Sequence, residues 1–517
     1  MRIKNKNLLS TSLVIFLIIF SITFNQYYGY IGILPIDSFL VFNSGYDVLN
    51  GYYPFKDYWT IKEPFIDLIQ AIFFKLFGVS WFSYVLHASI FNCLITIFTF
   101  FLLKNLNLKN GLSFFYSICV AILTYPTAGT PFSDHHTLIL CVLALYSFIL
   151  AINNKNNIFW FLIPVLLGFS FFSKQAPTVY VIFLITILSI IFFLKLKNIS
   201  NFMYAFTGVI TILFLLFFLL FLEGIKFNDF LTQYFSYPMS LGGSRFEWLF
   251  PFDFKRIFWR YKLQYLSILV LIYLFIKFSL EKKREKFSDY LIILSVIIFC
   301  LLTIMHQLMT INAIFIYCLI PIFCGLSHIY SKKYLKKNQI IGNLLIALTL
   351  CSTLYYYSQY VKNRTFMDLR DVNLENSIDG KEIHPELSKI KWITMFYPTE
   401  PVKEAYNIKL VLKMLEEDKS KKMIITDYQF ISVFLEEYDF SPTRFWYDFH
   451  GYPTEKNTYF NYWKEFVLTQ IRKNDIKNIY VLNPLHGETK PLENILKNCY
   501  KKYIYSETFY KLVLNNC

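Results

Sequence analysis

Long apolar stretches separated by short polar loops fill the first 360 residues of the chain. Each stretch is close to the roughly 20 residues that an α-helix needs to cross a hydrocarbon core. The pattern therefore predicts a polytopic α-helical membrane protein with about eleven transmembrane helices. We place them at residues 8–24, 81–103, 112–127, 135–152, 157–173, 176–194, 201–222, 264–280, 287–305, 311–329 and 339–360.

From about residue 361 the pattern changes to a mixture rich in charged residues. Apolar runs of strand type occur at 422–426 and 478–482, and amphipathic helical spacing occurs at 402–415 and 460–471. Alternating helices and strands favour a small α/β domain. The sequence thus divides into a membrane domain, residues 1–360, and a C-terminal α/β domain, residues 361–517.

Basic residues are sorted between the two sides of the predicted membrane. They precede the first apolar stretch and then fall in every second loop, which is the positive-inside pattern. This places the N-terminus in the cytoplasm and, with an odd number of spans, the C-terminal domain outside the cytoplasmic (inner) membrane. The formal net charge of +15 therefore reflects topology and not nucleic-acid binding. These residues are Arg2, Lys4, Lys6, Lys104, Lys109, Lys155, Lys195, Lys197, Lys282 to Arg284, Lys286 and Lys332 to Lys337.

Of the nine cysteines, seven lie in predicted spans, where a thiol is most simply a small core side chain. Cys499 and Cys517 lie in the exported domain. Disulfides form in oxidising compartments, so the sequence leaves open whether Cys499 and Cys517 are bridged.

The first outer loop, residues 25–80, carries two stretches of apolar residues at helical spacing, 37–50 and 64–77. Both are too short to span a membrane, so we predict interfacial helices. Pro64 suits a first helical turn, which would direct the free N–H groups of that helix toward Lys62 and Glu63. Such a helix end is an anion site.

Acids, lysines and aromatic rings gathered at one face of a membrane protein are typical of a site for a substrate with an apolar tail and a charged head, and we interpret this substrate as a lipid-linked sugar. Sugar transfer from a polyprenyl phosphate has few requirements. The phosphate leaves as a stable anion, so it needs only cations or a metal to neutralise its charge. The acceptor hydroxyl needs a base, and one carboxylate is the minimum for a single displacement with inversion. Asp37 fits that role by its position at the water boundary after the first span, and the alternative is an N-cap of the following helix.

Several further residues are candidates for the same site. Lys62 would hold the lipid phosphate, and Glu63 would order Lys62 or bind a metal; the alternative is two solvated residues at a helix start. Asp57 is a reserve candidate. Aromatic residues of the loop, Tyr53 and Tyr58 among them, would stack on a sugar.

Two outer turns add charged residues. Asp134 follows the third span as a second carboxylate or as a helix N-cap, and His135 and His136 beside it are weak metal-ligand candidates because they lack ligand spacing. Lys174, at the turn after the fifth span, would contact phosphate or snorkel to water. His306 occupies a corresponding turn and has little weight. Arg245, in the outer loop 223–263, is a further phosphate candidate.

The arrangement resembles the GT-C superfamily of membrane glycosyltransferases, which includes protein O-mannosyltransferases and the lipid A aminoarabinose transferase. The resemblance rests on Gly51-Tyr52-Tyr53-Pro54-Phe55-Lys56-Asp57 followed by Lys62-Glu63-Pro64, and on Ser173-Lys174-Gln175. It implies that Asp37 is the base, that Lys62 and Arg245 contact the lipid phosphate, and that Asp134 lines the acceptor or sugar pocket. Many relatives have Asp-Glu where this chain has Asp37-Ser38, which weakens the case for a metal there.

The sequence therefore predicts an inverting glycosyltransferase with a polyprenyl-phosphate sugar donor and a lipid, glycan or protein acceptor, acting in cell-envelope glycosylation of lipopolysaccharide or protein. Membrane lipids are its other partners. No cofactor is required by this chemistry, and a divalent metal stays open, with Glu63, His135 and His136 as candidate ligands. The alternatives are a transporter or flippase, and a polymerase or ligase, of lipid-linked glycans.

Overall fold

The computed structural model describes residues 2–125, 128–154, 156–196, 199–247, 253–281, 287–312, 314–336, 338–444, 446, 451–482, 490–497 and 499–515. The chain forms two compact units. The helical unit comprises Met1–Gly29, Val85–Leu216 and Arg245–Phe366. The mixed unit comprises Tyr30–Tyr84, Phe217–Ser244 and Met367–Cys517. Residues 30–84, which include most of the loop that we predicted on the outer side, thus belong with the C-terminal region, whereas the sequence division at residue 360 had left them with the spans.

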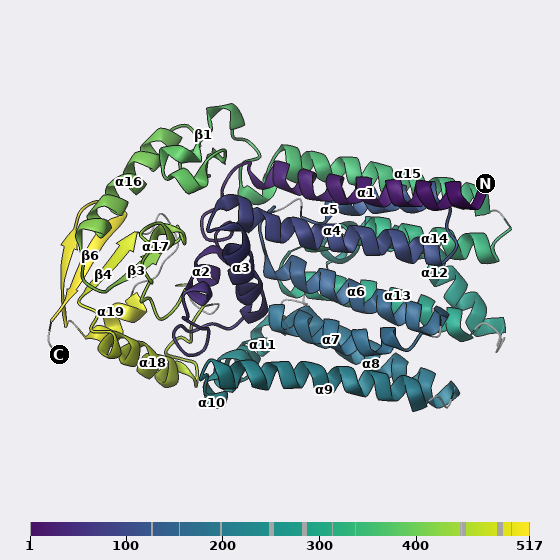
Figure 1. Ribbon diagram of the computed structural model, residues 1–517, viewed down its shortest axis with the longest axis horizontal. Helices are drawn as coiled ribbons and strands as arrows, with labels where there is room; N and C mark the ends of the chain where they lie inside the picture. The colour runs from purple at the N-terminus through teal and green to yellow at the C-terminus, as the bar shows by residue number, and fades with distance from the viewer. Residues whose placement is uncertain are drawn as a thin grey trace. The chain divides into compact units, whose positions relative to one another are not determined.

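Helices of the membrane region follow the predicted apolar stretches and lie side by side in Figure 1. Among the described residues, nine helices are long and apolar enough to cross a membrane, which supports a polytopic protein. Two predicted spans correspond to shorter apolar helices, α5 and α7. The helices are α1 (Arg2–Gly29), α4 (Trp81–Asn105), α5 (Asn110–Leu123), α6 (Ser133–Asn154), α7 (Ile158–Ser173), α8 (Gln175–Leu196), α9 (Ile199–Leu222), α12 (Lys262–Glu281), α13 (Phe287–Met309), α14 (Leu319–Tyr334) and α15 (Asn338–Tyr356).

Helix α6 is the centre of its neighbourhood in the helical unit. In the most apolar stretch of α6, 94% of the residues are buried, and the helix packs against α7, α8 and α13. Helix α9 is the opposite case, with 11% buried and Phe206 and Phe214 exposed. A helix that exposes large apolar side chains along its length is suited to lipid rather than to water.

The mixed unit contains a four-stranded sheet in the order β3-β4-β6-β5. Strands β3 (Lys422–Thr426) and β4 (Asn478–Leu482) are parallel, and both match the predicted strands. Strands β6 (Phe509–Leu514) and β5 (Tyr500–Ile504) add antiparallel pairs that the sequence had not predicted. Helices α16 (Pro401–Glu417) and α18 (Phe460–Lys473) confirm the two predicted amphipathic helices, and α17 (Ile431–Phe434), α19 (Lys490–Leu496) and the short strands β1 (Ile378–Asp379) and β2 (Lys391–Trp392) complete the unit.

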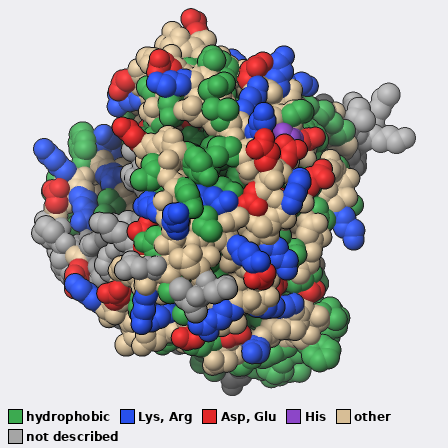
Figure 2. All heavy atoms as spheres, turned by 90° about the vertical axis from the view of Figure 1, so that its left-hand side faces the viewer, with side chains coloured by type: hydrophobic (Ala, Val, Ile, Leu, Met, Phe, Trp, Pro, Cys, Tyr) green, Lys and Arg blue, Asp and Glu red, His purple; other side chains and the backbone are tan. Residues whose placement is uncertain are grey.

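The core of this unit joins the sheet to the first outer loop. Helix α18 buries Trp463, Val467 and Ile471, which share one face at a spacing of one turn. They pack with Ile479 of β4 and with Trp59 of the loop, in one apolar cluster. Figure 2 shows acidic and basic side chains interspersed over the face of the mixed unit that it presents, as on an ordinary water-facing surface.

Helices α2 (Phe42–Leu49) and α3 (Pro64–Phe77) of the outer loop pack against each other. Gly45 permits their close approach, because a Cβ atom there would lie 2.5 Å from Cγ of Gln70. Helix α3 has the predicted bounds, with Pro64 in its first turn. Helix α2 begins at Phe42, and residues 37–41 form turns instead of the predicted helical start.

Cys499 is disulfide-bonded, while the seven other described cysteines are free thiols. Cys517, which the sequence suggested as its partner, lies outside the described residues.

Asp418 connects the loop before β3 to β4. Its carboxylate accepts hydrogen bonds from the Ser420 hydroxyl at 2.6 Å, the Asn478 amide at 2.7 Å and the Tyr480 hydroxyl at 2.7 Å. Burial alone would raise the pKa of Asp418, but the bonds from Ser420 and Tyr480 outweigh burial and hold this pKa well below its usual range.

The substitution Asp418→Asn is expected to destabilise the sheet by about 1–3 kcal/mol, because Ser420, Asn478 and Tyr480 would lose the carboxylate to which they donate. Since the folded-state pKa is depressed, the stabilisation is present above the unfolded pKa of about 4 and is lost as the pH falls below it. Chemical denaturation of the purified chain at pH 7 and pH 3 measures both effects. A variant as stable as the wild type at pH 7 would contradict this role.

Candidate functional site

The backbone before Asp37 is held by the C-terminal region of the same unit. The N–H of Gly32 donates to the carbonyl of Lys391 at 3.1 Å, and the N–H of Ile33 donates to that of Ile393 at 3.0 Å. The N–H of Ile36 donates to the carbonyl of Asp427 at 2.7 Å. The position of Asp37 is therefore set by a segment nearly 400 residues later in the chain.

Asp37 does not cap helix α2. It lies in a tight turn in which the Ser38 N–H donates to the carbonyl of Leu34 and the Ser38 hydroxyl accepts from the N–H of Leu34, both at 2.9 Å. The N-cap of α2 is Val41, with no side-chain cap hydrogen bond. The capping interpretation of Asp37 is thus wrong for this helix, because the chain makes a full turn before α2 begins.

Lys62 and Glu63 form an ion pair directly before α3. The Nζ atom of Lys62 lies 2.9 Å from Oε1 of Glu63, and the two side chains are 27% and 5% exposed. The Thr60 hydroxyl donates to the carbonyl of Lys62 at 2.8 Å, which further orders this segment. Glu63 therefore takes the first of its two predicted roles, ordering Lys62.

Backbone strain occurs next to both of these residues. Ile36, which precedes Asp37, has a φ of 68°, and Glu63, which follows Lys62, has a φ of 76°. A β-branched residue in the left-handed region is a marked outlier, and such strain persists only where the surroundings impose it. Strained residues concentrate at functional sites, so their presence here favours a functional interpretation of Asp37 and Lys62.

Asp37 and Lys62 line one cavity of about 360 Å³, within the range of roughly 300–1,000 Å³ usual for small-molecule sites. Two further carboxylates, Asp368 and Asp427, lie in its wall. Among the residues that the structure describes, the lining consists of Leu34, Pro35, Ile36, Asp37, Leu40, Lys62, Asp368, Met395, Phe396 and Asp427, all in the mixed unit.

Four of these residues come from the C-terminal region, and the sequence had not predicted them as site residues: Asp368, Met395, Phe396 and Asp427. Asp427 had a detectable signal, because it directly follows a strand, β3, that pairs in parallel with β4. Ligands in α/β sheets bind outside the carboxyl ends of such strands. The other three carry no local pattern.

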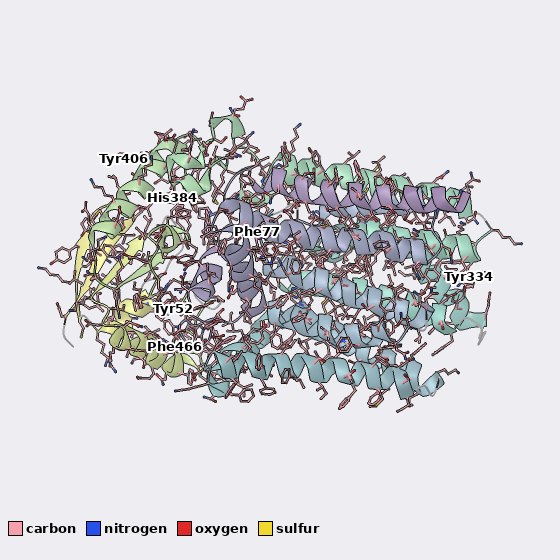
Figure 3. The ribbon with its side chains drawn as sticks, in the orientation of Figure 1. Tyr52, Phe77, Tyr334, His384, Tyr406 and Phe466 are labelled. Carbon is pink, nitrogen blue, oxygen red and sulfur yellow. The ribbon has the colours of Figure 1, made fainter. Side chains whose placement is uncertain are left out.

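Aromatic residues of the loop pack within the unit. Tyr58 is buried, its hydroxyl donates to Asp67 at 3.2 Å, and the Arg444 guanidinium lies 4.7 Å from its ring centre. Tyr52, labelled in Figure 3, stacks on Tyr438 with ring centres 3.6 Å apart. Tyr53 is half-buried, and its N–H donates to Asp57 at 2.9 Å. Packing and turn formation account for these residues, Asp57 included.

In the helical unit, Asp134 and Lys174 are brought together as a buried ion pair. The Nζ atom of Lys174 donates to both carboxylate oxygens of Asp134, at 2.8 and 2.7 Å. The Nε2 atom of His306, in α13, lies 3.6 Å from Oδ1 of Asp134. The sequence had given His306 little weight as a site residue. Lys174 is thus directed to a carboxylate and does not snorkel away, since an ionised group at this depth needs a partner.

The two adjacent histidines point to different neighbours. His135 packs on Tyr125 with ring centres 4.5 Å apart, while His136 meets the Tyr125 hydroxyl at 2.8 Å and Nε2 of His87 at 3.0 Å. In the part of the chain that the structure describes, no three His, Cys, Asp or Glu side chains are grouped to hold a metal, and this includes the cavity carboxylates.

Arg245 lies near the end of helix α11 (Tyr237–Glu247), and its side chain lies outside the described residues. The candidate residues therefore form two groups, one in each unit: Asp37, Lys62 and Glu63 in the mixed unit, and Asp134, Lys174 and His306 in the helical unit.

No protein family model matches the chain, and no curated protein sequence matches it. Its function must therefore be argued from the chemistry of these residues.

Proposed function

We propose that the chain is an inverting glycosyltransferase that moves a sugar from a polyprenyl-phosphate donor to an acceptor hydroxyl. The observation that carries this proposal is the cavity that Asp37 and Lys62 line together, with strained backbone beside each of them. The reaction requires one carboxylate as a base and one cation for the departing phosphate, and this cavity offers both.

The proposed step is a single displacement. The Asp37 carboxylate takes the proton of the acceptor hydroxyl while the acceptor oxygen forms a bond to the anomeric carbon. The bond from that carbon to the phosphate oxygen breaks, and polyprenyl phosphate leaves with the electron pair. Lys62 stabilises the negative charge that builds up on the leaving phosphate. Attack opposite to the leaving group inverts the anomeric carbon.

We infer the class of sugar donor from the resemblance to GT-C enzymes, and two features of the chain agree with a lipid-linked donor. The long apolar helices suit a protein that meets a lipid-linked donor in the membrane. The disulfide at Cys499 supports the placement of the C-terminal region outside the cytoplasmic membrane, since stable disulfides form in oxidising compartments. The lysine pattern adds a cytoplasmic N-terminus.

The rival proposal of a transporter or flippase for lipid-linked glycans is favoured by the buried Asp134–Lys174 pair, because ionisable residues within a membrane commonly mark a substrate or ion path. Transporters place such residues near the midplane on broken helices. Asp134 instead lies in the first turn of α6, and Lys174 lies between α7 and α8. A polymerase or ligase shares the donor chemistry and differs in its acceptor.

The proposal is tested by incubating the purified full chain with a panel of polyprenyl-phosphate sugars, together with lipid, glycan and peptide acceptors. We expect one donor to be consumed, with release of polyprenyl phosphate and appearance of a glycosylated acceptor. Movement of an intact donor across a vesicle membrane, with no chemical change, would instead support the flippase. Failure to act on any donor would contradict a glycosyltransferase.

A further inference from the structure

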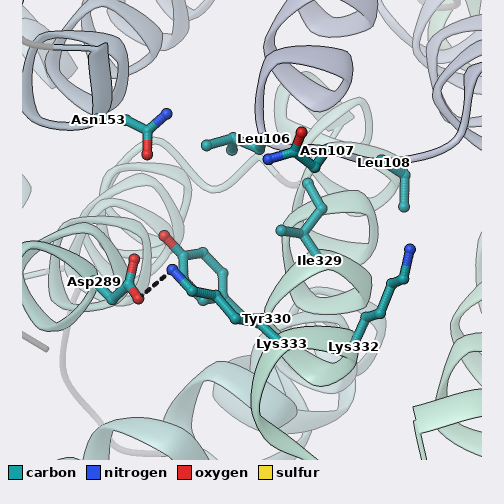
Figure 4. Close-up of a pocket in the computed structure, with 9 residues that line it drawn as sticks. All are labelled: Leu106, Asn107, Leu108, Asn153, Asp289, Ile329, Tyr330, Lys332 and Lys333. Carbon is teal, nitrogen blue, oxygen red and sulfur yellow. Dashed lines mark hydrogen bonds and ion pairs between the residues drawn. The ribbon is translucent and has the colours of Figure 1, made fainter.

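A second cavity, of about 330 Å³, lies in the helical unit at the ends of its helices (Figure 4). Its walls come from the turn after α4, the end of α6, the start of α13 and the end of α14. It shares no residue with the cavity at Asp37 and belongs to the end of the helices where the basic residues gather.

The charged groups of this second cavity do not cancel. Asp289 is matched by Lys333, whose Nζ atom lies 2.6 Å from its Oδ2, and the Tyr334 hydroxyl also donates to Asp289. Lys332 lines the opposite side of the cavity from that pair in Figure 4. Within the described ranges, no carboxylate lies at ion-pair distance from Lys332. Among the described residues, the lining therefore holds two lysines and one aspartate, which leaves one positive charge.

The free carbonyls at the C-terminal end of a helix carry partial negative charge, which would oppose the binding of an anion. The C-terminal end of α4, however, is capped. The N–H groups of Leu106, Asn107 and Leu108 donate to carbonyls of its last turn at 3.0 Å each. The C-terminal end of α14 is capped in the same way, because the Leu335 N–H donates to the Ser331 carbonyl at 2.8 Å. Among the side chains that line the cavity is the amide of Asn107, whereas the Asn153 amide nitrogen donates to Oδ1 of Asn105 at 3.4 Å and to Oδ1 of Asn154 at 2.9 Å.

We propose that this cavity binds the phosphate group of an anionic glycerophospholipid. The Lys332 ammonium and the amide group of Asn107 are donors of the kind that a phosphodiester accepts from. Leu106, Leu108 and Ile329 line the same cavity and supply apolar contacts for the glycerol and the first acyl carbons. A basic cavity between transmembrane helices at the charged membrane side is a recurring site for anionic head groups.

The lipid is distinguished from free phosphate by its apolar part. Equilibrium binding to the purified full chain is measured for short-chain phosphatidylglycerol, short-chain phosphatidylcholine and inorganic phosphate. We expect phosphatidylglycerol to bind tightest, with an affinity that falls as salt is added. Inorganic phosphate binding as tightly as phosphatidylglycerol would overturn the lipid assignment, and phosphatidylcholine binding as tightly would overturn the requirement for a net negative charge.

Variants locate the site. Lys332→Gln is expected to weaken phosphatidylglycerol binding about tenfold, because one charge-assisted contact is lost. The matched control is Lys336→Gln, which removes the same charge from an exposed lysine outside the cavity and should leave the affinity within about twofold. Equal losses in Lys332→Gln and Lys336→Gln would overturn the proposal, since they would reflect general surface charge.

Discussion

The variant Asp37→Asn is expected to lose glycosyl transfer by about 10²–10⁴-fold in kcat while it folds normally. An amide has nearly the shape of the carboxylate but cannot accept the proton of the acceptor hydroxyl. Folding should survive because Asp37 is half-buried in a turn and caps no helix. The transfer rate per folded molecule measures the effect, and binding of the donor, measured without acceptor, should be nearly unchanged.

A matched control separates loss of the base from loss of a negative charge. Asp371→Asn makes the same change at an exposed position outside the cavity, and its activity should equal that of the wild type. Asp37→Asn with more than about a tenth of wild-type activity would rule out Asp37 as the general base, because removal of such a group lowers rates by at least about 100-fold.

The second large effect is expected at Arg444, a buried cation of the mixed unit. Its guanidinium donates to Asp47 of α2 and to the carbonyls of Asp439 and Ser441, at 2.9 and 2.8 Å for the two carbonyls. The Asp439 carboxylate lies 3.5 Å away. One cation therefore serves two buried carboxylates, one from the outer loop and one from the C-terminal region.

Replacing Arg444 with Met is expected to destabilise the mixed unit by about 3–5 kcal/mol, since removal of one partner leaves buried charge without compensation. Burial raises the pKa of Asp47 to about 7, although Arg444 acts in the opposite direction, and burial also raises the pKa of Asp439. Without Arg444 both values should rise further. The unit would then bind more protons folded than unfolded, so its stability should fall as the pH rises from about 4 through 7.

The loss caused by Arg444→Met should therefore be larger at pH 8 than at pH 5. The half-life of the C-terminal region under limited proteolysis, measured in the full chain at both pH values, tests this. Arg472→Met, at an exposed position of α18, is the matched control and should change little. A loss that is equal at both pH values would contradict the account of two carboxylates sharing one guanidinium.

Local patterns in the sequence predicted the elements that local physics determines. Proline has no N–H to lose at the first helical turn, so α3 begins at Pro64 as predicted. The apolar run of β3 is bounded by polar residues, and its limits were predicted to the residue. Strands β5 and β6 were missed because neither alternates between buried and exposed positions: β5 is exposed from Lys501 to Ile504, and β6 buries only Phe509 and Leu512.

The candidate site could be predicted only in part. Asp37, Lys62, Asp134 and Arg245 were expected to converge on one cavity. Asp37 and Lys62 do line one cavity, whereas Asp134 belongs to the other unit and the Arg245 side chain lies outside the described residues. The turn at Asp37 could not be foreseen, because it depends on the hydrogen bond between Ile36 and Asp427, far apart in the chain. The same long-range packing explains Tyr58, whose ring faces Arg444. An aromatic residue near a predicted site gives no local sign of whether it faces a ligand or a core.

The most direct measurement is the anomeric configuration of the transferred sugar. Purified full chain is given a polyprenyl-phosphate sugar of known configuration, and the anomeric configuration of the product is determined by nuclear magnetic resonance. A single displacement with Asp37 as base predicts the inverted configuration and one polyprenyl phosphate released for each sugar transferred. A product that keeps the donor configuration would contradict the account, as would the absence of transfer from every donor of the panel.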